Sequence, residues 1–223
     1  MTDHRPVILG VAGSMSNCGK TTLACAIIAR LAAYLRVGAL KISTSTPDHR
    51  CERTGLACGC LRFDGSARTL RDECATAAKG KDTGRFALAG ARPVHWLQAT
   101  SLAVDMAATE AIQEFASLPV DVVVVEGAAP IRLGIADRSV LVYRADRPAK
   151  PTFGSLLTHG NVLAVSVTEP QDECALLDLR ATLPWPGAEP LCPLITDDAA
   201  SVDRVVDLIL APITNRLLSL AAS

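Results

Sequence analysis

The stretch ILGVAGSMSNCGKTTLACAII, residues 8–28, decides how this chain folds. Its first part is apolar, its middle is small and polar, and its last part begins a helical pattern. In that pattern apolar residues recur every fourth position, at Leu23, Ile27, Leu31 and Leu35. We therefore expect a buried strand, a short loop and a helix from about residue 20 to about residue 36.

The loop has the pattern of a phosphate-binding loop, which is Gly, four residues and then Gly-Lys-Ser/Thr. Ser14, with Gly13 before it, stands at the first position. Backbone N–H groups of such a loop and the positive end of the helix dipole hold phosphate oxygens. We expect Lys20 to reach the β and γ phosphates and the Thr21 hydroxyl to ligate Mg²⁺. The alternative is an ordinary capped helix. The predicted nucleotide-binding residues are Gly13, Ser14, Asn17, Cys18, Gly19, Lys20, Thr21 and Thr22.

Composition limits the fold and the partners. The chain has 223 residues, 49% of them hydrophobic, and a formal net charge of -1. This suits one α/β domain over residues 1–223, and it gives no general attraction to nucleic acid or to an anionic membrane. The polar start and the interrupted apolar runs predict a soluble, cytoplasmic protein. In that setting the eight cysteines are better explained as reduced thiols or metal ligands than as disulfides.

Apolar runs alternate with helical patterns along most of the chain, as in VGALKIS at 37–43, DVVVVEG at 121–127 and NVLAVSVTE at 161–169. Such alternation predicts a mainly parallel sheet flanked by helices, the three-layer fold of P-loop NTPases. Helices are expected at 101–117, with Leu102, Met106, Ile112 and Phe115 on its apolar face, and at about 171–181. Residues 44–81 show no sustained period and are interpreted as an insertion at the carboxyl edge of the sheet.

Charged residues at strand ends are the next candidates. Glu126 follows four valines, and a carboxylate in that position holds a Mg²⁺ water or orients the attacking water. Asp121 begins the same strand and is expected to face solvent. Lys41 ends another strand, where it either neutralises phosphate, binds an acidic substrate or is simply solvated. The candidate catalytic residues are therefore Lys20, Glu126 and Lys41, and the candidate Mg²⁺ ligands are Thr21 and Glu126.

The insertion carries a second candidate metal site. Four thiolates within one irregular segment can form a tetrahedral zinc site or hold an iron–sulfur cluster. Their spacing, Cys-x6-Cys-x-Cys and a fourth farther on, is not the paired Cys-x-x-Cys of common zinc modules. The alternative is that they are small apolar residues packed under a loop. The four residues are Cys51, Cys58, Cys60 and Cys74.

Four segments together resemble a known family. In order, GSMSNCGKTTL, VGALKIS, GKDTGRFALAGA and VVVVEGA are similar to motifs of the molybdopterin-guanine dinucleotide biosynthesis protein B family. Its members are small P-loop GTP-binding adaptors in the signal-recognition and dethiobiotin-synthetase-like class of NTPases. The resemblance covers residues 8–128. It implies phosphate and Mg²⁺ roles for five residues and places Asp82 near the substrate side; the five are Gly19, Lys20, Thr21, Thr22 and Glu126.

The chain departs from that family in two places. Of the His- and Asp-rich turn after the second strand, only Asp48 and His49 are present. The guanine-reading Asn-Lys-x-Asp is missing, and the strand expected to carry it ends SVTE, with Glu169 in place of the aspartate. We therefore expect only modest discrimination between GTP and ATP.

These patterns predict a Mg²⁺-dependent P-loop protein that binds and slowly hydrolyses GTP or ATP. The resemblance implies coupling to maturation or insertion of a metal-containing cofactor, with a protein partner. Two alternatives are an ATP-dependent synthetase of the dethiobiotin-synthetase type, acting on a small anionic substrate, and a non-catalytic partner protein that responds to nucleotide or metal. A homodimer is a further expectation; a nucleic-acid or membrane partner is not expected.

Overall fold

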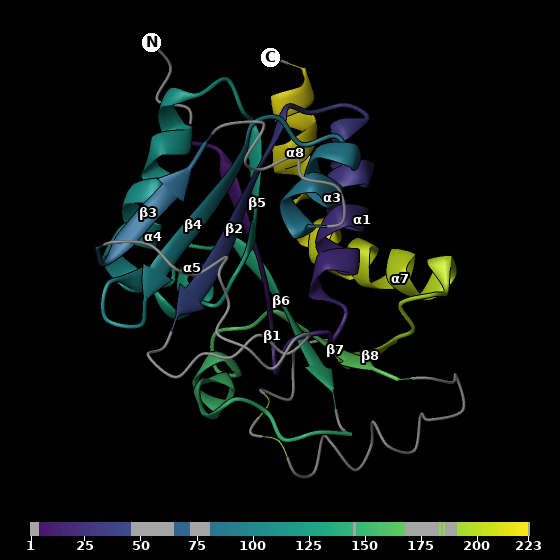
Figure 1. Ribbon diagram of the computed structural model, residues 1–223. Coiled ribbons are helices and arrows are strands. Elements are labelled where there is room, and N and C mark those ends of the chain that lie inside the picture. The colour runs from purple at the N-terminus through teal and green to yellow at the C-terminus, as the bar shows by residue number, and fades with distance from the viewer. Residues whose placement is uncertain are drawn as a thin grey trace.

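A computed structural model describes residues 5–45, 65–71, 81–144, 146–167, 183, 185 and 191–222. Within them one sheet has eight strands in the order β3-β4-β2-β5-β1-β6-β7-β8 (Figure 1). All neighbouring pairs are parallel except β3 with β4. The strands are β1 (Val7–Gly13), β2 (Val37–Ser45), β3 (Ala67–Leu70), β4 (Val94–Thr100), β5 (Val122–Glu126), β6 (Arg138–Arg144), β7 (Val162–Ser166) and β8 (Leu191–Leu194).

Helices cover both faces of this sheet, as predicted. They are α1 (Lys20–Ala32), α3 (Asp82–Leu88), α4 (Val104–Glu114), α5 (Ala129–Arg132), α7 (Ala199–Leu210) and α8 (Thr214–Ala221). The short 3-10 helices are η2 (Phe115–Ser117), η3 (Pro151–Leu156) and η5 (Ala211–Ile213). Leu9 and Val11 of β1 pack with α1 and α7, whereas Ile8 packs with α4. The central strands are therefore buried on both sides, as parallel strands between helix layers require.

The predicted helix after the phosphate loop is confirmed. Leu23, Ile27 and Leu31 are fully buried on the face of α1 that contacts the sheet. The regular helix ends at Ala32, earlier than expected, and Leu35 packs into the same core from the turn that follows. The apolar spacing thus identified the buried side correctly, although it could not locate the end of the helix.

The helix expected at 101–117 exists as α4 and η2, and Ile112 and Phe115 are buried as expected, but the other two residues assigned to its apolar face are not. Leu102, 98% exposed, lies in the turn before α4, and Met106 is 67% exposed. The buried side of α4 consists mainly of small residues, namely Val104, Ala107, Ala108, Ala111 and Ile112. Alanines let the helix approach the sheet closely, so the larger apolar side chains were a misleading guide to its orientation.

The segment interpreted as an insertion, residues 44–81, includes the end of β2 and a further strand. β2 continues to Ser45, and β3 pairs antiparallel with β4 at the edge of the sheet. The expectation that residues 44–81 lack regular structure was therefore wrong at 67–70, because four residues are too few to show a period. Asp48, His49 and the four cysteines of the candidate metal site lie outside the described residues, as does the helix expected at 171–181.

Asp121 was expected to face solvent, but it is buried. It is 3% exposed, and its carboxylate accepts hydrogen bonds from the backbone N–H (2.8 Å) and the Nε (3.0 Å) of Arg36. The turn between α1 and β2 therefore closes over the start of β5. This contact joins segments 85 residues apart, so the local sequence gave no sign of it.

We expect Asp121→Ala to lower the free energy of unfolding by about 1 to 3 kcal/mol, because it leaves the backbone N–H of Arg36 without its acceptor. Urea denaturation of the full chain measures this change. Asp207→Ala is a suitable control, since it removes an aspartate that pairs with an arginine, Arg30, at the exposed surface. An Asp121→Ala effect no larger than the control's would contradict a stabilising role.

Candidate functional site

The loop between β1 and α1 has the backbone that phosphate binding needs. Asn17 and Gly19 both have positive φ, 56° and 98°, on either side of Cys18. Alternating backbone conformations of this kind form concave arrangements of N–H groups that bind anions. Gly13 is also required, because a Cβ atom there would lie 2.5 Å from the Cys18 sulfur.

The buried side chains of Ser14 and Cys18 hold the phosphate loop in place. The Ser14 backbone N–H donates to the Val142 carbonyl (2.8 Å), and its hydroxyl accepts from the backbone N–H of Arg144 (3.1 Å). The Cys18 thiol donates to the Met15 carbonyl at 3.2 Å. Both side chains are buried. Their contacts fix the loop against β6, so they shape the site instead of presenting side-chain groups to it.

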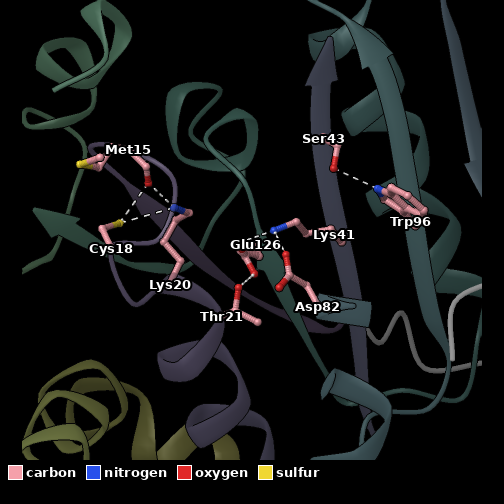
Figure 2. A network of polar contacts seen from close by, with 9 residues as sticks. All are labelled: Met15, Cys18, Lys20, Thr21, Lys41, Ser43, Asp82, Trp96 and Glu126. Carbon is pink, nitrogen blue, oxygen red and sulfur yellow. Dashed lines mark hydrogen bonds and ion pairs between the residues drawn. The ribbon is translucent and has the colours of Figure 1, made fainter. Parts of the chain in front are cut away.

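Lys20 lies across the loop in the structure. Its ammonium group donates to the Met15 carbonyl and is 3.4 Å from the Cys18 sulfur (Figure 2). These partners belong to the loop itself, which places the positive charge at the concavity.

Beside the loop, four polar side chains from four elements form a cluster. Glu126, 2% exposed at the end of β5, accepts a hydrogen bond from the Thr21 hydroxyl at 2.9 Å. Its other oxygen is paired with Lys41 of β2 (Figure 2). Lys41 also contacts Asp82 of α3, with 2.7 Å between the ammonium nitrogen and Oδ2. The structure therefore brings together Thr21, Glu126 and Lys41 as candidate site residues, with Asp82 beside them.

Lys41 is charged within this cluster. Burial disfavours the ammonium form, but attraction to Glu126 and Asp82 outweighs it and raises the pKa of Lys41. Burial likewise opposes the ionised form of Asp82, yet Lys41 holds the pKa of that carboxyl below its ordinary value. The solvated-lysine alternative for Lys41 was wrong, since its side chain is only 17% exposed.

The cluster also offers donors that suit Mg²⁺. The Thr21 hydroxyl and the carboxylates of Glu126 and Asp82 are the hard oxygen ligands that this ion prefers. Among the described residues, no group of three or more His, Cys, Asp or Glu side chains is arranged to hold a metal ion. The Thr21 hydroxyl and the two carboxylates supply only part of a Mg²⁺ coordination shell. They therefore fit an ion whose other ligands are phosphate oxygens and water, as is usual for Mg²⁺.

The phosphate loop and the polar cluster line the same cleft, which has a volume of about 700 Å³. From Lys41 and Asp82 it passes the loop to the carboxyl ends of β7 and β8. Two arginines that sequence reasoning missed also line it. Arg85 donates to the Thr22 hydroxyl (3.3 Å), and Arg144 donates to the Asn17 carbonyl (3.2 Å). Arg144 could have been found as the residue at the carboxyl end of a strand beside β1.

The comparisons with known proteins concern the fold. No family model and no curated protein matches the chain. HypB from Helicobacter pylori, solved in complex with nickel, is similar with a TM-score of 0.53 and 12% identity, over 96% of this chain and 90% of that chain. The MinC:MinD complex of Aquifex aeolicus has a TM-score of 0.47 and 14% identity, over 97% of this chain and 94% of that chain. A ParA family ATPase from Chlorobium tepidum TLS has a TM-score of 0.42 and 9% identity, over 97% of this chain and 98% of that chain.

The likeness to HypB confirms the predicted α/β fold of the P-loop NTPase type. Membership of the molybdopterin-guanine dinucleotide biosynthesis protein B family stays a prediction. In the described part of the chain, no helix combines the length and the apolar character needed to span a membrane.

Proposed function

We propose that this protein is a Mg²⁺-dependent P-loop NTPase that binds a nucleoside triphosphate in the cleft and hydrolyses it slowly. The observation that carries the proposal is the cluster of Thr21, Glu126, Lys41 and Asp82 directly beside the phosphate loop. A loop alone binds phosphate, whereas a loop next to two carboxylates and a charged lysine can also position a metal ion and water.

Each residue has a role that follows from its position. Lys20 exchanges the Met15 carbonyl for oxygens of the β and γ phosphates. Thr21 and Glu126 would hold Mg²⁺, which neutralises phosphate charge when bound. Glu126 also orients the attacking water, and the ion pair with Lys41 holds the Glu126 carboxylate in place.

Slow turnover follows from the same contacts. Both carboxylate oxygens of Glu126 are engaged, one by Thr21 and one by Lys41. Each oxygen keeps a lone pair that can accept from water, but the positive charge of Lys41 weakens Glu126 as an acceptor. A protein partner that shifts Lys41 toward Asp82 would relieve this effect, so the arrangement supports a switch-like protein.

The proposed process is maturation or insertion of a metal-containing cofactor, together with a protein partner. The sequence resemblance over residues 8–128 supports it. HypB from Helicobacter pylori, which is similar in fold, was solved in complex with nickel. The zinc or iron–sulfur site at Cys51, Cys58, Cys60 and Cys74 stays a prediction, as does a homodimer.

A synthetase of the dethiobiotin type has less support. It needs Lys41 to face a small anionic substrate, but two carboxylates already neutralise this lysine. A non-catalytic protein would share the binding site and differ only in its lack of turnover.

Phosphate release from GTP and ATP tests the proposal. With the purified full chain we expect Mg²⁺-dependent release on the order of 10⁻⁴ to 10⁻² s⁻¹, the intrinsic range of P-loop GTPases. EDTA should abolish it, and small carboxylic acids should leave it unchanged. Release that requires such an acid would identify a synthetase, and binding without release would identify a non-catalytic protein.

A further inference from the structure

Arg144, at the carboxyl end of β6, lies in the cleft beside the phosphate loop. Its backbone N–H donates to the Ser14 hydroxyl at 3.1 Å, and its Nη1 donates to the Asn17 carbonyl at 3.2 Å. Both partners belong to the loop, and the positive φ of Asn17 helps to form the concavity of N–H groups. The guanidinium group therefore lies next to the position that we propose for the phosphates, although the proposed chemistry does not use it.

A carboxylate occupies one edge of this guanidinium group. The Nε and Nη2 atoms of Arg144 donate to the two oxygens of Asp146, at 2.8 and 2.7 Å. Asp146 lines the same cleft. The hydrogen bonds from Arg144 lower the pKa of the Asp146 carboxyl, so this group is ionised at neutral pH. A negative charge of the protein is thus bound to an arginine beside the phosphate loop.

The edge of the guanidinium group that binds Asp146 also suits a phosphate group. Arginine makes two parallel hydrogen bonds to a carboxylate or to a phosphate. The triphosphate of a nucleotide carries more negative charge than one carboxylate. The side chain of Asp146 is 54% exposed, so its ion pair with Arg144 stabilises the fold little and the carboxylate can turn into water. Exchange of the carboxylate for a phosphate therefore costs little.

Asp146 differs from the other paired carboxylates of the cleft. Glu126 and Asp82 pair with Lys41, but they also offer oxygen ligands to Mg²⁺. Their negative charge is therefore useful when a nucleotide is bound. Asp146 instead follows β6, which lies on the opposite side of β1 from the strand that carries Glu126. Its charge opposes the phosphates unless the carboxylate moves away.

We propose that Arg144 is a phosphate ligand of the bound nucleotide and that Asp146 competes with the nucleotide for it. This inference rests on the proposed function. In the nucleotide-free protein, Asp146 accepts the two hydrogen bonds from the edge of the guanidinium group. When a nucleotide binds, phosphate oxygens accept these hydrogen bonds and the carboxylate becomes hydrated. The ion pair therefore lowers the affinity for nucleotide, and its breakage accompanies binding.

Calorimetric titration of the full chain with GTP and ATP, in the presence of Mg²⁺, tests this competition. Arg144→Ala should lower the affinity by about 10-fold or more, because charged hydrogen bonds to phosphate are lost. Asp146→Asn should raise the affinity by about 3- to 5-fold, the scale of an exposed ion pair. A gain in affinity does not result from damage to the fold, so Asp146→Asn is decisive even if Arg144→Ala disturbs the loop.

Asp197→Asn is the matched control. Asp197 is also exposed and also lines the cleft, but it is not among the partners that the described part of the chain gives to Arg144. The control removes the same charge, so it measures the general repulsion of phosphate, and its effect should be smaller than that of Asp146→Asn. In the Arg144→Ala background, the gain from Asp146→Asn should fall to the level of the control, because the two residues act as a pair.

The outcomes separate the proposed function from the competition. If the wild type binds neither nucleotide, the proposed function fails and the inference with it. If the wild type binds nucleotide and Arg144→Ala keeps the wild-type affinity, Arg144 is not a phosphate ligand. If Asp146→Asn gives no larger gain than Asp197→Asn, or the same gain with and without Arg144, the competition is overturned.

Discussion

Replacing Lys20 with alanine is expected to lower nucleotide affinity by at least about 10²-fold while leaving the fold intact. Among the described residues, the partners of the ammonium group belong to the phosphate loop, namely the Met15 carbonyl and the Cys18 sulfur, and not to the core. Hydrogen bonds to charged phosphate oxygens are each worth about 1.5 to 3 kcal/mol, and the lysine makes more than one. Calorimetric titration with GTP and ATP measures the loss, and circular dichroism with urea denaturation checks the fold.

Lys81→Ala is a matched control for that experiment. Lys81 is also a lysine near the sheet, but its ammonium group lies 5.4 Å from the ring centre of Trp96, and the residue does not line the cleft. Its removal should leave nucleotide affinity unchanged. Unchanged affinity in Lys20→Ala itself would show that nucleotide does not bind at the loop.

The second large effect is expected for Glu126→Gln, which should reduce turnover by about 10²-fold or more and keep nucleotide affinity within a few-fold. Glutamine has the same shape as glutamate, so the Thr21 contact and the packing at the end of β5 can persist. It lacks the negative charge that Lys41 and Mg²⁺ require. Single-turnover phosphate release at saturating nucleotide separates this loss from any change in binding.

Glu114→Gln provides the comparison. Glu114 pairs with Arg71, and neither residue lines the cleft, so turnover should stay at the wild-type rate. If Glu126→Gln also turns over at the wild-type rate, Glu126 serves only as a buried partner of Lys41, and the proposed hydrolysis depends on another group.

The parts of this protein that the sequence predicted correctly depend on neighbours along the chain. The strand, loop and helix around Gly19 follow from local periodicity and from the backbone freedom of glycine. The burial of β5 follows from its four successive valines, and the position of Glu126 at its carboxyl end follows from that strand. Parallel strands alternating with helices then required a layered α/β fold. Each connection must return from the carboxyl end of one strand to the amino end of the next, and the helix that does so packs on a face of the sheet.

The parts that only the tertiary structure decided depend on residues far apart in the chain. From the sequence, Lys41 is a phosphate or substrate ligand or a solvated residue, and only the contacts with Asp82 and Glu126, 41 and 85 positions away, decide among these. Asp121 reads as a surface acid until the turn before β2 covers it. The face of α4 was decided by which side chains could lie closest to the sheet. Such contacts have no local signal, because burial and the pairing of charges are set by what the folded chain places opposite each residue.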